Sequence, residues 1–465
     1  MVGESIRQGS RLLSRPAVCK WLIRDWLVRF VSRNVWILGP IRIVLVALGR
    51  KDDADRILML RHRIANDMGL VPAIKACLTR VVWHPEKFVP RPESEFEINS
   101  SAFRAIVLLV PSFNEGGIQR GVLLIKFTET FRVFHHSIDI DRLMKYFVVV
   151  LEPSWSGYCL PEILCWSRYK QKVIVQASES RDREFLQRLG SNLIPIDVGA
   201  SDWVDYRVFF PRQVPKKYMA IYVANLSPIK RVHVFLGAIR RIVRLNKKAR
   251  FAVVLSSWGG AKDEFEQLLE YYDVGGSLDV YSDRNQMELN DLLNSASVAV
   301  LLSLKEGSNK TLFEAMFAGV PVIMLEENIG VNKSYINSAT GMMVSEPDLP
   351  DAIIELANRS EEFRSRAWAI ENIAPERSTL KLASVIRRAF EPNEVASGDL
   401  LVKVNSPEAT YFDQDATAGL PHIRQVLGLF VKQEREAAIS GRDTVERLYS
   451  ANSEDRALHP MTGGF

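Results

Sequence analysis

The second half of the chain alternates between two hydrophobic patterns. Short, continuous apolar runs predict buried strands, and longer segments with apolar positions three and four residues apart predict helices between them. The predicted strands are residues 218–224, 250–255, 277–281 and 298–302, and the predicted helices are residues 261–272 and 286–295. Because parallel strands need a crossover between them, this alternation predicts a doubly wound α/β sheet with helices on both faces.

Buried strands are also predicted in the first half of the chain, at residues 104–110, 146–151, 172–176 and 192–196. The loop after the first strand contains Asn114 and the glycine pair Gly116 and Gly117. Strand, glycine loop and helix in that order predict a second Rossmann-like unit whose backbone can approach a ligand. A simple turn would need the same glycine pair. Glu152 follows the second strand, where it could face a substrate or serve the structure alone.

These patterns divide the chain into four regions. Residues 1–100 form a basic, largely helical N-terminal region, and residues 101–215 form a first α/β domain. Residues 216–390 form a second α/β domain, and residues 391–465 form a polar extension with one helix predicted at 423–438.

Residues 16–40 predict one helix with an apolar stripe on one side. The stripe consists of Ile23, Trp26, Leu27 and Phe30. Tryptophan with flanking cations is typical of a helix in a membrane interface, and a helix packed on its own protein would show the same pattern. No uncharged run in residues 16–48 approaches the roughly 20 residues that span a bilayer.

Composition and charge narrow the function. The chain has 465 residues, 47% hydrophobic and 25% charged, as expected of a soluble protein with two or three domains. Its formal net charge is +5, but residues 1–50 hold nine Lys or Arg against two acids. The net charge of residues 51–465 is close to zero, which argues against nucleic-acid binding by this part of the chain. The four cysteines lack metal-ligand spacing, and residues 1–15 lack the apolar core of a signal peptide. We therefore expect a protein of the cytoplasm or the cytoplasmic face of a membrane.

Two carboxylates eight residues apart mark the most informative stretch. A predicted strand ends at Leu302, Glu306 lies in the loop after it, and Glu314 lies in the following helix. The residues that open this helix are Gly307, Ser308, Asn309, Lys310 and Thr311. Several of them are helix-capping types, and a helix N-terminus presents unpaired N–H groups that suit a phosphate.

This stretch resembles the E-x7-E motif of GT-B fold glycosyltransferases, most closely the retaining enzymes of family 4 (glycosyl transferases group 1). The resemblance implies that Glu306 faces the donor sugar and that Glu314 holds the nucleotide ribose. It also implies the GT-B fold, with two Rossmann-like doubly wound domains facing a cleft. The loop residues Asn114, Gly116 and Gly117, and Glu152, would lie near the diphosphate and the acceptor.

The turn after residue 224 extends the resemblance. Lys230 matches a family lysine that grips the donor diphosphate, but Asn225 stands where the family has arginine. Arg231 or Lys310 could compensate for the missing charge. Ser282, just after a predicted strand, lies where the resemblance implies the nucleotide base.

The implied reaction moves a sugar from a nucleotide-diphosphate sugar to a glycan or lipid-linked acceptor, with retention and with neither metal nor other cofactor. Cell-surface polysaccharide or glycolipid biosynthesis would be the setting. Lys230 would stabilise the departing diphosphate.

Two other functions are also consistent with the sequence. An epimerase or phosphorylase could use the same fold. A membrane-associated protein could bind the nucleotide sugar without transferring it, since Asn225 replaces an arginine and the family histidine has no equivalent. His135 and His136 lie in a connecting segment and are predicted at the surface. The donor sugar, its base and the acceptor are not distinguished.

Overall fold

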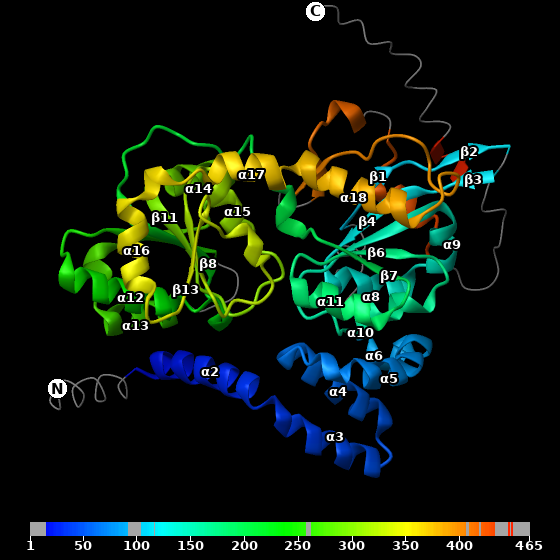
Figure 1. The fold of residues 1–465 in the computed structure, drawn as a ribbon, viewed down its shortest axis with the longest axis horizontal. Coiled ribbons are helices and arrows are strands. Elements are labelled where there is room, and N and C mark those ends of the chain that lie inside the picture. The colour runs from blue at the N-terminus through cyan, green and yellow to red at the C-terminus, as the bar shows by residue number, and fades with distance from the viewer. Residues whose placement is uncertain are drawn as a thin grey trace, which may run out of the picture. The chain divides into compact units, whose positions relative to one another are not determined.

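The computed structural model describes residues 15–91, 104–115, 117–256, 262–405, 409–417 and 420–432, together with residues 445, 446, 448 and 449. They form two compact units (Figure 1). Unit 1 contains the described residues up to Val35 and the segment Val204–Ala374. Unit 2 contains Trp36–Trp203 and the described residues from Pro375 on. Each unit is therefore built from two separate stretches of the chain, at limits that differ from the predicted ones.

Unit 1 is built on six parallel strands in the order β10-β9-β8-β11-β12-β13. The strands are β8 (Tyr218–Asn225), β9 (Phe251–Ser256), β10 (Leu278–Ser282), β11 (Ala296–Leu301), β12 (Val322–Leu325) and β13 (Gly341–Val344). From β8 the chain adds two strands on one side and three on the other, so this sheet is doubly wound, as predicted.

Helices cover both faces of the unit 1 sheet because successive strand residues point to opposite sides. In β9, Phe251 and Val253 belong to one apolar cluster, and Ala252 and Val254 belong to the other. The first cluster is closed by α2 (Pro16–Arg33), α12 (Val232–Leu245), α13 (Lys262–Tyr272) and α16 (Leu349–Asn358). The second is closed by α14 (Gln286–Asn294), α15 (Lys310–Phe317) and α17 (Ser365–Ile373).

Unit 2 contains a five-stranded sheet in the order β1-β4-β5-β6-β7. The strands are β1 (Ala105–Leu109), β4 (Gly121–Lys126), β5 (Phe147–Glu152), β6 (Val173–Gln176) and β7 (Leu193–Ile196). β4 to β7 are parallel, and β1 is antiparallel to β4. The α/β class with two parallel-sheet units is confirmed.

The winding of the unit 2 sheet differs from the prediction. Each strand from β4 to β7 is added on the same side, so right-handed crossovers place the connecting helices on one face. These are α8 (Thr128–Ser137), α9 (Ile140–Tyr146), α10 (Pro161–Leu164) and α11 (Ser180–Leu189). The other face packs against α18 (Pro375–Ala389) and the residues after it, which the sequence assigned to the second domain and the extension (Figure 1).

The strand predicted at residues 104–110 is confirmed by β1, but the prediction of a glycine loop leading into a helix after it is wrong. β1 leads into a small hairpin, β2 (Ser112–Asn114) and β3 (Gly117–Gln119), and returns as β4. The glycine that this return requires is Gly121. A Cβ there would lie 2.3 Å from the carbonyl oxygen of Leu109, so no other residue fits.

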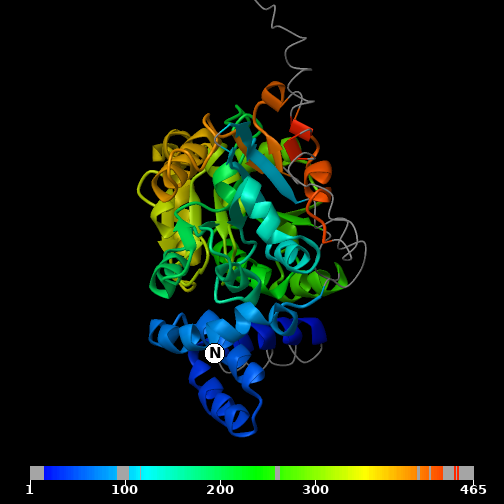
Figure 2. The ribbon, with the colours of Figure 1, turned by 90° about the vertical axis from the view of Figure 1, so that its right-hand side faces the viewer.

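The N-terminal helical region divides between the units. α2 ends at Arg33, not near residue 40, because the Asn34 side chain donates to the Phe30 carbonyl at 2.8 Å and closes the helix. Unit 2 receives η1 (Val35–Ile37) in part and α3 (Leu38–Ala47), α4 (Lys51–Ala65), α5 (Val71–Trp83) and α6 (Pro85–Phe88). In unit 2, α5 and α6 contact α10, and α4 packs on α5 and α6; these helices are drawn in blue (Figures 1 and 2).

No single described helix is long and apolar enough to cross a membrane, although α2 and the helical segment Val35–Ala47 meet the length and composition criteria when taken together.

The C-terminal extension folds onto unit 2. It forms β14 (Lys403–Asn405), β15 (Ala409–Tyr411) and α19 (Ile423–Gly428), the last shorter than the predicted helix, whose residues 433–438 lie outside the described ones. Phe430 is fully buried, and its carbonyl accepts from the amide of Asp139 at 2.7 Å. The remaining short helices are η2 (Met68–Leu70), η3 (Cys165–Arg168), η4 (Ala200–Trp203), η5 (Pro228–Lys230), η6 (Gly275–Ser277), η7 (Lys333–Tyr335), η8 (Ser360–Glu362) and η9 (Asp415–Thr417).

Candidate active site

Two loops meet at the carboxyl edge of the unit 1 sheet. β8 and β11 are parallel neighbours, and the strand order reverses between them. In open α/β sheets this reversal leaves a crevice at the carboxyl ends of the strands, where ligands bind. The turn after β8 carries Lys230, and the loop after β11 carries Glu306.

A pocket of 370 Å³ lies at this point and is lined mainly by polar side chains. They come from the ends of β8 and β9, from the residues after β10, and from the start of α15. The lining residues are Val223, Ala224, Asn225, Lys230, Val254, Leu255, Ser256, Asp283, Arg284, Leu289, Glu306, Ser308, Asn309, Lys310 and Thr311. The pocket therefore brings together most of the predicted donor-binding residues, and Gly307 lies in the same loop.

Glu306 is held by three side-chain donors. Its Oε1 accepts from the Lys230 Nζ at 2.6 Å, from the Asn309 Nδ2 at 3.3 Å and from the Ser303 hydroxyl. Only 5% of Glu306 is exposed, and its backbone amide donates to the Ile329 carbonyl at 2.8 Å. These donors fix the orientation of the Glu306 carboxylate, and the Lys230 ammonium group balances its negative charge.

Glu314 lies inside α15 rather than on the pocket wall. Asn309 caps this helix by accepting from the Leu312 amide at 2.9 Å. Lys310 and Thr311 line the pocket, and the Lys310 Nζ lies 3.6 Å from the Glu314 carboxylate. Burial raises the pKa of Glu314, and Lys310 and Thr311 oppose that shift. A ligand in the pocket would meet Lys310 and Thr311 before Glu314.

The turn after β8 is shaped by its own side chains. The Asn225 Oδ1 accepts from the Ser227 amide at 3.1 Å, and the hydroxyl of buried Tyr222 donates to the Lys230 carbonyl. The Lys230 side chain is 17% exposed, and Asn225 lines the same pocket. Asn225 therefore contributes an amide where a second cation was expected.

Arg231 does not supply that missing cation, contrary to the sequence-based expectation. Its guanidinium is fully buried and contacts Asp25, Glu327 and Glu346 on the side of the turn that faces α2. Arg231 has a positive φ of 54°, and this left-handed backbone directs its side chain away from that of Lys230. Lys310 remains as the second lysine of the pocket.

Ser282 lies in a neighbouring pocket of 580 Å³. This second pocket shares Leu255, Ser256 and Asp283 with the first, and Phe265 and Leu269 add apolar surface to it. The two pockets are therefore contiguous along the ends of β9 and β10.

The predicted acceptor loop lies in unit 2. Asn114 and Gly117 pair across the tip of the β2–β3 hairpin. Gly117 has a φ of 122°, and a Cβ there would meet nothing within 4 Å, so it serves the turn. Gly116 lies outside the described residues.

Glu152 is enclosed in a buried polar network at the end of β5. Its carboxylate accepts from the Lys403 Nζ at 2.6 Å and lies 3.9 Å from the Lys126 Nζ. The Asn405 Oδ1 accepts from both lysines at 3.0 Å. Burial lowers the pKa of Lys403 to about 8, against the opposing effect of Glu152. With 2% of Glu152 exposed, it serves the structure, which was the alternative that the sequence left open.

The prediction of two surface histidines is also wrong. His135 is buried against Trp166, with ring centroids 5.2 Å apart, and its Nε2 lies 2.9 Å from the Glu162 carbonyl. His136 is partly buried, with its Nε2 3.3 Å from the Val89 carbonyl.

Within the described residues, no three His, Cys, Asp or Glu side chains are grouped so that they could hold a metal ion. The expectation that no metal takes part in the reaction stays a prediction.

Comparison with known families identifies one domain. Residues 208–375 match the family model described as glycosyl transferases group 1. The match coincides with the C-terminal segment of unit 1 and includes Lys230, Glu306 and Glu314. It covers less than half of the chain. The match confirms the expected glycosyltransferase domain over these residues. A comparison with curated proteins found no match.

Solved structures give weaker similarity. TarM aligns at 15% identity and a TM-score of 0.46, over 57% of this chain and 54% of that one. Sucrose-phosphate synthase from Thermosynechococcus elongatus aligns at 17% and 0.45, over 57% and 72%. HepE from Anabaena, solved with UDP-glucose, aligns at 13% and 0.46, over 57% and 78%. The alignment spans only about half of TarM, and similarities this low say nothing about substrates.

Proposed function

We propose that this chain, which carries a group 1 glycosyltransferase domain, transfers a sugar from a nucleotide-diphosphate sugar to a glycan or lipid-linked acceptor. Retention at the anomeric carbon and a role in cell-surface polysaccharide or glycolipid biosynthesis belong to the proposal. The observation that carries it is the Lys230–Glu306 pair, 2.6 Å apart, at the strand-order reversal and beside the N-terminus of α15.

Lys230 is suited to the leaving diphosphate. When the bond to the sugar breaks, negative charge grows on the phosphate oxygens, and a fixed ammonium group stabilises that charge more than the ground state. The N-terminus of α15 adds a partial positive charge, and Lys310 adds a second cation at the pocket wall. Together they offset the replacement of arginine by Asn225.

Glu306 is suited to the donor sugar. A diphosphate would draw Lys230 away from Glu306, while Ser303 and Asn309 would continue to hold the carboxylate in place. An oriented carboxylate accepts hydrogen bonds from sugar hydroxyls or supports positive charge on the anomeric carbon. Glu314 would take the ribose once Lys310 has turned toward phosphate, which would open the approach to its carboxylate.

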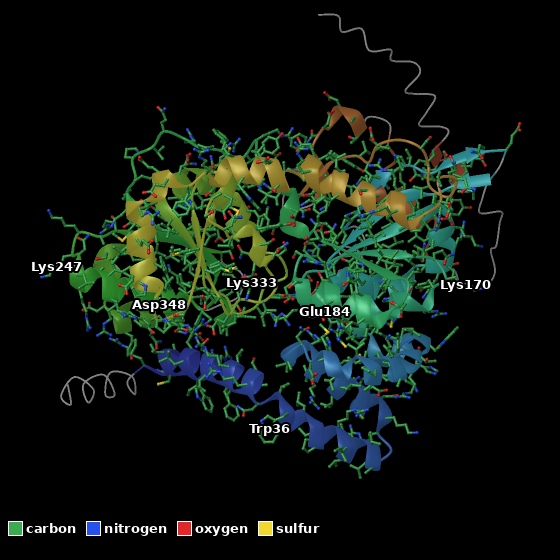
Figure 3. All side chains as sticks on the ribbon, viewed as in Figure 1. Trp36, Lys170, Glu184, Lys247, Lys333 and Asp348 are labelled. Atoms are coloured by element: carbon green, nitrogen blue, oxygen red, sulfur yellow. The ribbon has the colours of Figure 1, made fainter. Side chains whose placement is uncertain are left out.

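The proposal is tested with a panel of UDP-, GDP-, ADP- and dTDP-glucose. A donor at about 100 times its dissociation constant should stabilise the fold by roughly 2.7 kcal/mol, which shifts thermal unfolding by several degrees. Lys230→Met should reduce that shift and slow release of the nucleoside diphosphate by about 100-fold or more. Lys247→Met, an exposed lysine of the same unit, is the matched control and should change neither (Figure 3). Absence of a shift with any donor would contradict the proposal.

Asn225 supports a second candidate, a protein that binds the nucleotide sugar without transferring it. In this candidate the Asn225 amide does not replace the charge of an arginine, and Lys230 and Lys310 alone stabilise the leaving diphosphate too weakly for transfer. A thermal shift without nucleoside diphosphate release, with a membrane extract as acceptor source, would favour this candidate. Isomerisation or phosphorolysis of the sugar nucleotide would instead indicate the same fold used for other chemistry.

The outward face of α2 supports a membrane as the site of the acceptor. Its apolar side chains, Ile23, Trp26, Leu27 and Phe30, are between 41% and 59% exposed. Trp26 stacks on Phe30 with ring centroids 5.1 Å apart. Arg24 and Arg33 lie nearby on the same helix. An exposed apolar and aromatic face with flanking cations fits an anionic lipid surface, so we place the protein on the cytoplasmic face of a membrane.

A further inference from the structure

Lys230 and Arg231 are consecutive residues whose side chains serve opposite sides of one turn. The Lys230 Nζ reaches into the pocket and pairs with Glu306 at 2.6 Å. Arg231 has no exposed surface and contacts three carboxylates outside the pocket. The two neighbouring side chains are therefore anchored on opposite sides of the same turn.

The contacts of Arg231 are close and come from three parts of unit 1. Its Nε donates to Asp25 of α2 at 2.8 Å. Its Nη1 donates to Glu327, after β12, at 3.0 Å, and its Nη2 donates to Glu346, after β13, at 2.5 Å. Arg29 of α2 joins the cluster, 3.2 Å from Asp25 and 3.5 Å from Glu327. We call these five residues the Arg231 clamp.

The clamp holds Arg231 in an unfavourable backbone conformation. Arg231 has a φ of 54°, in the left-handed region that is unfavourable for a residue with a Cβ. Such conformations persist where the surroundings over-determine them, and they occur at functional sites. The turn is supported further by the bond from the Tyr222 hydroxyl to the Lys230 carbonyl and by the bond from the Ser227 amide to the Asn225 Oδ1.

α2 is fastened to unit 1 at a second, separate place. Near its start, Glu264 of α13 accepts from the Trp21 indole at 2.8 Å and from the Lys20 ammonium. Trp21 and Val18 are buried there. Because this second contact does not involve Arg231, the two attachments of α2 can be weakened one at a time.

We propose that Asp25 and Arg231 are positioning residues for Lys230, so that α2 contributes to the donor site through Asp25. Asp25 keeps the Arg231 guanidinium on the α2 side of the turn. The left-handed backbone at Arg231 then aims Lys230 at Glu306 and at the donor diphosphate. This inference rests on the proposed function, because it assigns α2 a role in that same transfer.

The inference is tested by a double-mutant cycle between Asp25→Asn and Lys230→Met. The assay is release of nucleoside diphosphate from the most active donor in the panel, per mole of folded protein. Asp25→Asn should lower kcat about 10- to 100-fold and leave KM within about twofold, since small misplacements of a catalytic group have effects of this size. In the Lys230→Met background the same change should have no further effect, because residues that act through one another are not additive.

Two further variants separate positioning from attachment. Glu264→Gln loosens α2 without touching the clamp and should leave kcat within about twofold, and Asp25→Glu, which keeps the carboxylate, should recover most of the activity. Asp25 lines a solvent-open pocket of 760 Å³, so an amide there can be hydrated and the fold preserved. If Asp25→Asn does not fold, Glu346→Gln is measured in the same cycle with the same expected result.

The outcomes distinguish the two levels of the proposal. If the wild-type protein neither binds nor turns over any donor, the proposed function is wrong and this inference falls with it. If the wild-type protein is active and the losses from Asp25→Asn and Lys230→Met multiply, the inference alone is overturned. Equal losses from Glu264→Gln and Asp25→Asn would also overturn it, because general loosening of α2 would then explain the effect.

Discussion

His62 and His135 are two buried histidines of unit 2 that take no part in the candidate site. Burial lowers the pKa of each to about 4, although Asp67 opposes the shift of His62 and the Glu162 carbonyl opposes that of His135. His135 packs on Trp166, and His62 lies 4.4 Å from the Phe185 ring centroid. Both side chains are therefore neutral in the folded protein at neutral pH.

The free energy of unfolding should fall as the pH is lowered from about 6.5 to 4. Over this window the unfolded histidines, with a pKa of about 6.5, bind protons that the folded ones do not. The loss should be on the order of 3 kcal/mol for each histidine, because each pKa unit corresponds to about 1.4 kcal/mol. Urea unfolding at pH 7 and pH 4.5 measures it. His135→Phe should flatten the pH dependence, whereas His84→Gln, at an exposed histidine, should not.

At the residue scale, the sequence indicated which residues share a pocket better than it indicated the direction in which each side chain points. Lys230 and Glu306, separated by 76 positions, lie in one pocket because both follow parallel strands that are neighbours in the sheet. Arg231 was misplaced because one left-handed residue reverses the side on which consecutive side chains lie. Lys403 was missed as the partner of Glu152 because it comes from 251 positions away, in a segment that reads as a polar tail.

At the element scale, the helix packed on its own protein is confirmed for α2, and the membrane alternative stays a prediction. Its Ala17, Val18 and Trp21 are buried in unit 1, and its predicted stripe is exposed. The stripe was predictable because it repeats at helical spacing. The break at Asn34 was not, since it depends on a single side-chain bond to the Phe30 carbonyl.

Binding to anionic vesicles should depend on the exposed stripe. The full chain should sediment with vesicles of phosphatidylglycerol and phosphatidylcholine more than with phosphatidylcholine alone, and less at high salt. Trp26→Gln should weaken binding about tenfold or more, because burying an aromatic side chain contributes roughly 1.5–3 kcal/mol. Leu245→Gln replaces an apolar side chain of α12 that is 79% exposed and serves as the control. Equal binding by the two variants would show that the stripe has another partner.

At the scale of the whole molecule, each unit combines two stretches of chain that are far apart in the sequence. Most strands of the two sheets were predictable because each is a short apolar run, but β4 was missed, since a helix was expected after the glycine loop. The helix that covers one face of the unit 2 sheet was not predictable, because α18 directly follows the unit 1 segment in sequence. It packs on the unit 2 sheet through Leu382 and Ile386, and Phe390 just after it packs there too. The hydrophobic pattern of a helix predicts that one face is buried, but not which of two sheets that face packs against.

Lys403→Met should destabilise unit 2 and leave donor binding by unit 1 intact. Removing this lysine leaves Glu152 buried with Lys126 at 3.9 Å as its remaining cation, and breaking a buried pair in this way costs about 3–5 kcal/mol. Adding Glu152→Gln should recover part of the loss, because the uncompensated charge is then gone. Lys170→Met, at an exposed lysine of the same unit, is the control (Figure 3). Thermal unfolding and the donor-induced shift report the two effects separately.

The separation of 206 positions between Asp25 and Arg231 also sets an order of events during synthesis. At roughly 5–20 residues per second, a ribosome needs about 10–40 s to reach Arg231 after Asp25 has been made. Throughout that interval Trp21 and Val18 have no partner from the C-terminal segment of unit 1, so the nascent α2 exposes these apolar side chains as well as its stripe. It can therefore meet a chaperone or a lipid surface before the domain that will hold it exists.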